Sequence, residues 1–259
     1  MVKTISIHSS RGGTGKSLLS SSLALIFASE GRNVALLDFD FRAPSFLTIF
    51  QAENSMKGWI NDYLDGKTEL SELMVDFTSR FATKGKLFVG FANPDMEAMR
   101  EIVRKNRRWQ MQALRRVTSM KQELADKFDV NVIIFDTSPG IQYSSVNAVV
   151  SADVAVIVST MDILDIGGAQ RIVRDLYLPF EKKTIIIVNK AIPYEFVSEE
   201  RREALVDRVK KTFSQPVFAI IPCYCDLLLT NRVSPFVLDR PEHPFTKVVK
   251  EIARRLDDY

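Results

Sequence analysis

Glycines and a lysine near the start of the chain have the spacing of a phosphate-binding loop. Residues 9–17 read Ser-Ser-Arg-Gly-Gly-Thr-Gly-Lys-Ser, after an apolar run at 4–8 and before an amphipathic stretch at 18–29. A strand, a glycine loop and a helix in this order let backbone N–H groups and the positive end of a helix dipole surround an anion. We therefore predict a nucleotide phosphate site formed by Gly12, Gly13, Thr14, Gly15, Lys16, Ser17 and Leu18.

Two residues of this loop have more specific expected roles. Lys16 is placed to reach the β- and γ-phosphates, and Ser17 to offer its hydroxyl to Mg²⁺. The usual pattern is G-x-x-x-x-G-K-[ST], but here Ser10 replaces the first glycine and Arg11 precedes the glycine pair. The alternative is an accidental glycine-rich turn, and the flanking strand and helix patterns argue against it.

Three aspartates follow apolar runs farther along the chain. Asp38 and Asp40 come directly after one run, and Asp136 ends another and opens the segment Asp-Thr-Ser-Pro-Gly. Carboxylates beside a triphosphate hold Mg²⁺ and orient the attacking water. We predict Asp38 and Asp136, with Ser17, as the metal site, and Asp40 as the residue that positions water. A helix cap at Asp38 and an ordinary turn at Asp136 are the alternatives.

The segment after Asp136 ends at Gly140, which is a candidate to turn its N–H toward the γ-phosphate.

A base pocket is expected where Asn189 and Lys190 end the apolar run at 184–188. Guanine-binding proteins place Asn-Lys-x-Asp at this point, but position 192 is Ile192, so the acceptor for the guanine edge is missing. A buried guanine donor left unpaired costs about 1–3 kcal/mol, which favours adenine. We expect Asn189 to contact the adenine and Pro222 to form a second wall of its pocket.

The elements that must position these residues indicate an α/β fold with a mostly parallel central sheet covered by helices on both faces. Continuous apolar runs separated by helical patterns are typical of strands buried on both sides. Ligands of such folds bind beyond the carboxyl ends of the strands, where the aspartates and Asn189 fall. Nothing resembling a linker divides the chain, which predicts a single domain over residues 1–259. The expected strands are 33–37, 86–91, 130–135, 154–159, 184–188 and 216–221.

Composition limits the classes of protein that this chain can be. Its 259 residues are 46% hydrophobic, without eighteen consecutive apolar residues or a signal-peptide pattern, so we expect a cytoplasmic protein. A net charge of +3 permits contact with nucleic acid or anionic lipid without requiring it. Cys223 and Cys225 are expected to be buried or base-contacting thiols. The alternative is a zinc or iron–sulfur site that a symmetric dimer would complete.

Taken together, the motifs resemble those of the deviant Walker-A ATPases of the MinD/ParA type. That family has a cation before Gly-Gly-x-Gly-Lys-[Ser/Thr], then Asp-x-Asp-x-x-x-Pro-Ser, then Asp-x-x-x-Gly. These patterns match Arg11 to Ser17, Asp38 to Ser45 and Asp136 to Gly140. The similarity extends nearly end to end and is weakest at 50–127.

The resemblance implies a Mg²⁺-dependent ATPase that is an ATP-bound sandwich dimer and an ADP-bound monomer. A protein partner would stimulate its slow hydrolysis, in the positioning or partitioning of division machinery, chromosomes, plasmids or another cellular machine. The family's cation is a lysine that crosses the dimer interface to the partner's phosphates, and here it is Arg11. A guanidinium can grip two phosphate oxygens, so Lys16, Asp40 and Arg11 are the expected catalytic residues. A solvated loop arginine is the alternative for Arg11.

Two function classes remain as alternatives to this switch. One is an ATP-dependent metabolic ligase of the dethiobiotin-synthetase type, which would need polar substrate ligands near the γ-phosphate. The other is a nucleotide-gated scaffold with little turnover.

A basic region between Arg100 and Lys127 is the candidate surface for DNA. Its helical pattern predicts an inward apolar face and an outward basic face, and a solvated helix face is the alternative reading. The inward residues are expected to be Met111, Leu114, Val117, Met120 and Leu124, and the outward ones Arg104, Arg108 and Arg115.

The amphipathic segment at 245–256 is the candidate for membrane contact. Its apolar residues are small and the chain then ends in Asp257-Asp258-Tyr259, so we expect it to pack on the sheet rather than bind anionic lipid. We expect the protein in the cytoplasm, with attachment to the membrane or the nucleoid as an alternative.

Overall fold

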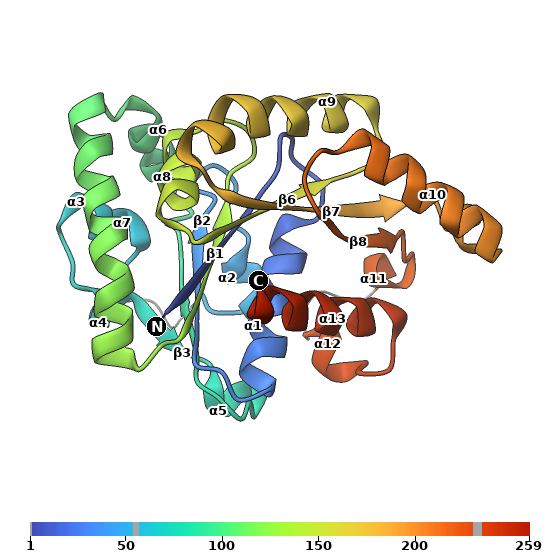
Figure 1. The fold of residues 1–259 in the computed structure, drawn as a ribbon. Coiled ribbons are helices and arrows are strands. Elements are labelled where there is room, and N and C mark those ends of the chain that lie inside the picture. Colours follow the sequence, from blue (N-terminus) through green and yellow to red (C-terminus); the bar gives the residue numbers. More distant parts are fainter. Residues whose placement is uncertain (1, 54–56, 230–234) are drawn as a thin grey trace.

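The computed structural model describes residues 2–53, 57–229 and 235–259 and contains one eight-stranded sheet (Figure 1). The strand order is β3-β4-β2-β5-β1-β6-β7-β8, with β3 antiparallel to β4 and all other neighbours parallel. The strands are β1 (Lys3–His8), β2 (Val34–Phe39), β3 (Met74–Asp76), β4 (Leu87–Gly90), β5 (Val132–Thr137), β6 (Val154–Ser159), β7 (Lys183–Ala191) and β8 (Val217–Pro222). The expected α/β class is confirmed.

Helices cover both faces of this sheet, as right-handed crossovers between parallel strands require (Figure 1). The α-helices are α1 (Lys16–Ser29), α2 (Phe46–Phe50), α3 (Ile60–Asp65), α4 (Leu70–Leu73), α5 (Thr78–Phe81), α6 (Met96–Arg104), α7 (Arg107–Phe128), α8 (Tyr143–Ser151), α9 (Ile163–Ile172), α10 (Glu199–Thr212), α11 (Asp226–Leu229), α12 (Phe236–Asp239) and α13 (Pro244–Asp258). A π-helical segment η1 (Val173–Tyr177) and the 3₁₀ turns η2 (Leu178–Phe180) and η3 (Pro193–Phe196) complete the list.

Alternate residues of each central strand belong to different hydrophobic clusters. In β6, Val154, Val156 and Val158 pack with α1, α12 and α13, whereas Ala155 and Ile157 pack with α9, η1 and α10. The same alternation in β5 gives a third cluster with α3, α7 and α8. Because the strands are buried on both faces, their sequences read as continuous apolar runs.

Six of these strands lie where the sequence predicted them, β6 with the same ends and the other five with differences of one to three residues, and β1 was expected at 4–8. It missed β3, which has only three residues, none of them buried, and pairs antiparallel at the sheet edge. A short edge strand lacks the continuous apolar run that identified the others.

The basic region forms two helices, α6 and α7, and Asn106 caps the second by accepting a hydrogen bond from the Trp109 N–H. Val117, Met120 and Leu124 are buried as expected. The inward placement of Met111 was wrong: its side chain is 53% exposed, because Ala113 occupies the buried position on that turn.

Helix α13 packs its apolar face against α1 and β8, which confirms the expected use of the C-terminal segment. Val249, Ile252 and Leu256 are fully buried there. Within the described ranges, no helix is long and apolar enough to cross a membrane.

Candidate functional site

The residues predicted to bind phosphate and metal meet at the carboxyl ends of three adjacent parallel strands. Asp38 of β2 is paired in register with Asp136 of β5, and β5 lies beside β1, which leads into the glycine loop. A one-residue slip in this pairing would turn one carboxylate to the opposite face of the sheet. The sheet register therefore holds both carboxylates beside the loop.

The glycine loop leaves the first N–H groups of α1 without a side-chain cap. Gly13 and Gly15 have φ angles of 80° and 98°, which only glycine adopts at little cost, and Gly15 is the residue from which α1 starts. A Cβ at Gly15 would lie 2.3 Å from the amide nitrogen of Asn189. Uncapped N–H groups and the positive end of α1 are the features that bind an anionic phosphate.

Lys16 is buried at the start of α1, and its Nζ donates a hydrogen bond to Ser9 Oγ at 2.9 Å. Burial lowers the pKa of Lys16, and the nearby Asp136 and Asp40 act in the opposite direction. The ammonium group is thus held in the loop by a neutral hydroxyl that an incoming phosphate oxygen can replace.

Asp38 and Asp136 each keep one buried carboxylate oxygen without a partner among the described residues. Asp38 Oδ1 accepts from the Asp40 N–H and Asp136 Oδ1 from the Ser20 hydroxyl, whereas both Oδ2 atoms are unpaired. Burial raises the pKa of Asp136 to about 6, and the nearby hydroxyls of Ser17 and Ser20 act in the opposite direction. Burial, and then the negative charges of Asp136 and Asp40, raise the pKa of Asp38 well above its ordinary value.

Unpaired buried oxygens of this kind fit a divalent cation. Mg²⁺ prefers oxygen ligands, keeps several waters and uses only one or two carboxylates. Ser17 contributes a hydroxyl beside Asp136. The three residues predicted as the metal site, Ser17, Asp38 and Asp136, therefore suit Mg²⁺ in both chemistry and burial.

Asp40 connects the two acidic segments. Its Oδ1 accepts hydrogen bonds from the Ser138 hydroxyl at 2.8 Å and from the N–H groups of Arg42 and Ala43 at 3.3 and 3.2 Å. All three donors bind the same oxygen, which leaves Oδ2 to accept from a water molecule. Sequence reasoning missed Ser138, although its place two residues after Asp136 could have indicated it.

Asn189 and Lys190 brace the glycine loop from the end of β7. Asn189 Nδ2 donates to the Thr14 carbonyl at 2.8 Å, and Lys190 Nζ donates to the Gly13 carbonyl at 2.5 Å. Asn189 therefore supports the loop directly, and its contact with adenine stays a prediction. Pro222 is half-buried opposite Ala191 in the β7–β8 pairing, and its role as a pocket wall likewise stays a prediction.

Cys223 is half-buried and Cys225 is exposed, and both are free thiols. In the part of the chain that the structure describes, no group of three or more His, Cys, Asp or Glu side chains surrounds them as a metal site would. A metal site here would need ligands from a second copy of the chain.

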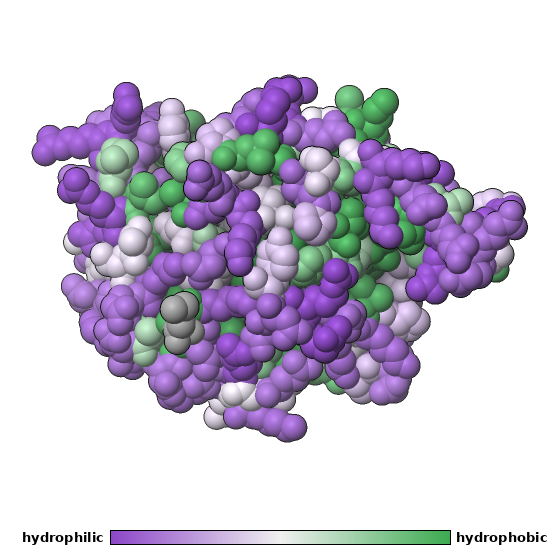
Figure 2. Space-filling view, viewed as in Figure 1, coloured by the Kyte–Doolittle hydropathy of each residue, from purple (hydrophilic) through white to green (hydrophobic). Residues whose placement is uncertain are grey.

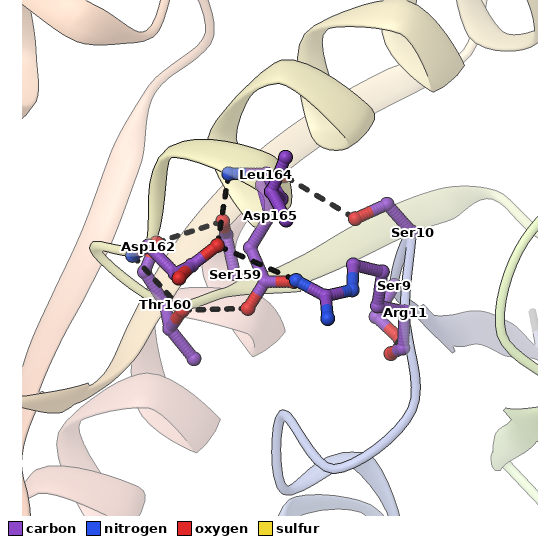
Figure 3. A network of polar contacts seen from close by, with 8 residues as sticks. All are labelled: Ser9, Ser10, Arg11, Ser159, Thr160, Asp162, Leu164 and Asp165. Carbon is purple, nitrogen blue, oxygen red and sulfur yellow. Dashed lines mark hydrogen bonds and ion pairs between the residues drawn. The ribbon is translucent and has the colours of Figure 1, made fainter.

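Arg11 extends from the loop toward the start of α9 (Figure 3). Its guanidinium lies 3.4 Å from Asp162 and 3.6 Å from Asp165, and the Arg11 side chain is 53% exposed. Asp162 also caps α9 by accepting from the Leu164 N–H at 2.8 Å. Asp162 is as exposed as Arg11, and such exposed ion pairs are worth about 0–1 kcal/mol; Asp165 is buried but lies farther from the half-exposed guanidinium, so Arg11 is held only weakly by its own chain.

A glycine loop between the first strand and helix of a mostly parallel sheet, with acidic residues at neighbouring strand ends, defines a P-loop nucleotide-binding fold. A family described as AAA domain matches residues 2–187. The chain belongs to the MinD/ParA-type deviant Walker-A P-loop ATPases, a family whose members hydrolyse ATP.

Three similar proteins illustrate this membership. The septum site-determining protein MinD of Thermotoga maritima is 25% identical over 260 residues, covering 99% of this chain and 88% of that protein. The solved structure of MinD complexed with Mg-ADP from Pyrococcus horikoshii has a TM-score of 0.75 at 20% identity, covering 99% of this chain and 96% of that one. The MinC:MinD cell division protein complex of Aquifex aeolicus has a TM-score of 0.76 at 26% identity, covering 100% of this chain and 97% of that one.

Proposed function

We propose that this protein is a Mg²⁺-dependent ATPase that acts as an ATP-driven dimerisation switch. The observation that carries the proposal is the convergence of uncapped α1 N–H groups, the Lys16 ammonium and the unpaired Oδ2 atoms of Asp38 and Asp136. Together they supply donors for phosphate oxygens and ligands for the accompanying cation. The MinD relative bound to Mg-ADP supports the same pair of ligands here.

Each residue has a distinct role in this proposal. The loop N–H groups and Lys16 bind the β- and γ-phosphates, and Asp40 Oδ2 accepts a hydrogen bond from the attacking water. Bound Mg²⁺ would neutralise charge on the phosphate oxygens, held through Ser17, Asp38 and Asp136. Positioning and charge stabilisation are most of what phosphoryl transfer requires, so these side chains suffice for slow hydrolysis.

The proposed dimer face surrounds Arg11. Ile163 and Leu164, which begin α9 beside the partners of Arg11, are 81% and 63% exposed, and Ile141 and Tyr143 after Gly140 are also exposed. Apolar side chains project over α9 at the upper right of Figure 2. Exposed apolar residues around a weakly held cation suit an interface that closes over the nucleotide, with Arg11 moving to the partner's phosphates.

The test of the switch is the mass of the Asp40→Ala variant in solution with Mg-ATP. Without the residue that positions water, ATP should persist and the mass should double, while the same variant with ADP stays monomeric. Lys16→Ala is the control that should bind neither nucleotide. A monomer at high protein concentration with saturating ATP would refute the dimer, and ATP consumption only with an added small acid or amine would favour the ligase.

The partner is proposed to be protein or DNA. The MinC:MinD complex of a relative supports a protein that stimulates hydrolysis. For DNA, Arg104, Arg108 and Arg115 are exposed on α6 and α7 and make no ion pair within the described residues. The apolar face of α13 is buried against α1, which gives no support to membrane binding through that helix.

DNA binding can be tested by measuring affinity for a random duplex against salt concentration. Each lost phosphate contact should reduce the slope of log affinity against log salt by about 0.9. Replacing Arg104, Arg108 and Arg115 with Gln should therefore flatten the slope by up to roughly three such steps. Glutamine changes at Arg171, Arg174 and Arg202, on α9, η1 and α10, remove the same number of charges elsewhere and are the matched control.

A further inference from the structure

A buried histidine and tyrosine lie next to the glycine loop and have no part in the mechanism above. His8 is the last residue of β1, and its Nδ1 lies 2.6 Å from the hydroxyl oxygen of Tyr177. Its Nε2 lies 2.8 Å from the carbonyl oxygen of Gly140. Both side chains are fully buried, and 168 residues of chain separate them.

The partners fix where the imidazole proton resides. A carbonyl oxygen can only accept, so His8 Nε2 carries the hydrogen and donates it to Gly140. Burial lowers the pKa of His8 to about 4 and raises that of Tyr177 well above its ordinary value, so both are neutral near pH 7. The Tyr177 hydroxyl then donates to His8 Nδ1, and a directed chain runs from Tyr177 through His8 to Gly140.

Gly140 is held on both sides by the residues that lead into the glycine loop. Its N–H donates to the Ser9 carbonyl at 2.8 Å, and its carbonyl also accepts from the Gln142 N–H at 3.1 Å. Its φ angle of 72° is one that other residues rarely adopt. The N–H and the C=O of Gly140 lie in the two peptide planes that meet at its Cα atom, and Ser9 and His8 hold one each, so a shift of the Gly140 segment away from Ser9 also strains the hydrogen bond to His8.

The π-helical segment η1 explains how Tyr177 reaches this position. The segment follows α9 directly and ends at Tyr177, and the wider turn of a π-helix points its side chains in directions that differ from those of a regular α-helix. The other end of α9 carries Asp162 and Asp165, the partners of Arg11. One helix therefore contacts Arg11 at its start and, through Tyr177 and His8, the Gly140 segment at its end.

We propose that His8 and Tyr177 are positioning residues that hold Gly140 against Ser9 and so set how strongly this ATPase discriminates ATP from ADP. The inference rests on the proposed function, together with the expectation from the sequence that the Gly140 N–H turns toward the γ-phosphate. That phosphate must compete with the Ser9 carbonyl, and the His8 anchor opposes the turn. ADP lacks the γ-phosphate and does not require the turn.

The experiment compares the affinities for a non-hydrolysable ATP analogue and for ADP, by titration calorimetry, in the unmodified protein and in Tyr177→Phe. Loss of the hydroxyl leaves His8 Nδ1 unpaired and loosens the anchor. One neutral hydrogen bond corresponds to a factor of about three to ten in an equilibrium. The analogue should therefore gain about three- to tenfold in affinity relative to ADP.

Tyr63→Phe is the matched control, because it also removes a phenol hydroxyl from a buried side chain, one bonded to Glu123 between α3 and α7. Its affinity ratio should equal that of the unmodified protein. General loosening of the fold would weaken both nucleotides together and leave the ratio unchanged. If Tyr177→Phe still binds both nucleotides and its affinity ratio is unchanged, this inference is overturned and the proposed function is not.

A second measurement needs no variant. Nitrogen NMR of the unmodified protein should show His8 as the neutral Nε2–H form, with shifts that change on adding the ATP analogue and stay constant on adding ADP. A proton on Nδ1, or equal responses to the two nucleotides, would overturn the inference. Failure of the unmodified protein to bind either nucleotide would instead refute the proposed function on which it rests.

Discussion

The stability that His8 contributes to this protein should be lost as pH falls below about 6.5. The folded-state pKa of His8 is lowered to about 4, chiefly by burial, whereas an unfolded chain has the ordinary value of about 6.5. Between these values the unfolded state binds the proton and the folded state does not. The stability that neutral His8 contributes is therefore complete above pH 6.5 and is lost as pH falls toward 4.

The size of this loss follows from the shift. A difference of about 2.5 pKa units at about 1.4 kcal/mol per unit gives a loss of about 3 kcal/mol by pH 4, of which about 2 kcal/mol has gone by pH 5. His8→Gln cannot titrate. It should be less stable than the unmodified protein at pH 7.5, but the difference should shrink by about 2 kcal/mol at pH 5.

The assay is guanidinium unfolding at several pH values between 5 and 7.5, with the difference in free energy of unfolding taken between the two proteins at each pH. The chain has two histidines. His243→Gln is therefore introduced into both proteins, so that His8 is the only histidine by which they differ. A difference independent of pH would show that folded His8 takes up the proton as easily as the unfolded chain, and the reasoning from burial would be refuted.

Three further outcomes are expected. Lys16→Ala should abolish the rise in melting temperature that Mg-ATP causes, because the variant lacks the ammonium group, now bonded to Ser9, that would bind the phosphates. A rise as large as that of the unmodified protein would contradict this role. Arg11→Ala should lower hydrolysis at high protein concentration and prevent the ATP dimer while changing the free energy of unfolding by less than about 1 kcal/mol, because the Arg11 side chain is half exposed and Asp165 keeps the hydrogen bond from Thr160; a dimer of full mass in light scattering would exclude the cross-interface role. Leu124→Ala in α7 should cost about 2–5 kcal/mol in urea unfolding without changing nucleotide affinity, and a parallel loss of affinity would show that α7 supports the site.

The parts of the site that sequence could predict are those made by local patterns. Residues 9–17 and the aspartates at the ends of β2 and β5 could be predicted because each functional residue directly follows an apolar strand pattern in the chain. The pairing of Asp38 with Asp136 was expected only in general terms, since it depends on register between strands far apart in sequence.

The contacts that sequence could not predict are long-range ones between ordinary residues. The attachment of Asn189 to Thr14, the hydrogen bond from Ser138 to Asp40 and the His8–Tyr177 pair all join segments from different strands or helices. The ion pairs of Arg11 with the start of α9 belong to the same class. No periodicity or spacing encodes such neighbours, because they are set by how the sheet twists and where α9 changes to η1.

The place of β1 in the middle of the sheet has a consequence for biosynthesis. Its two neighbours are β5 and β6, so the strand that precedes the glycine loop finds its first hydrogen-bonding partner only after residue 137 has been made and its second only after residue 159. At about 5–20 residues per second, the ribosome needs on the order of ten seconds to supply them. The glycine loop is made long before the strands that fix β1, so a nascent chain can hold nucleotide there only once β5 and β6 have been added.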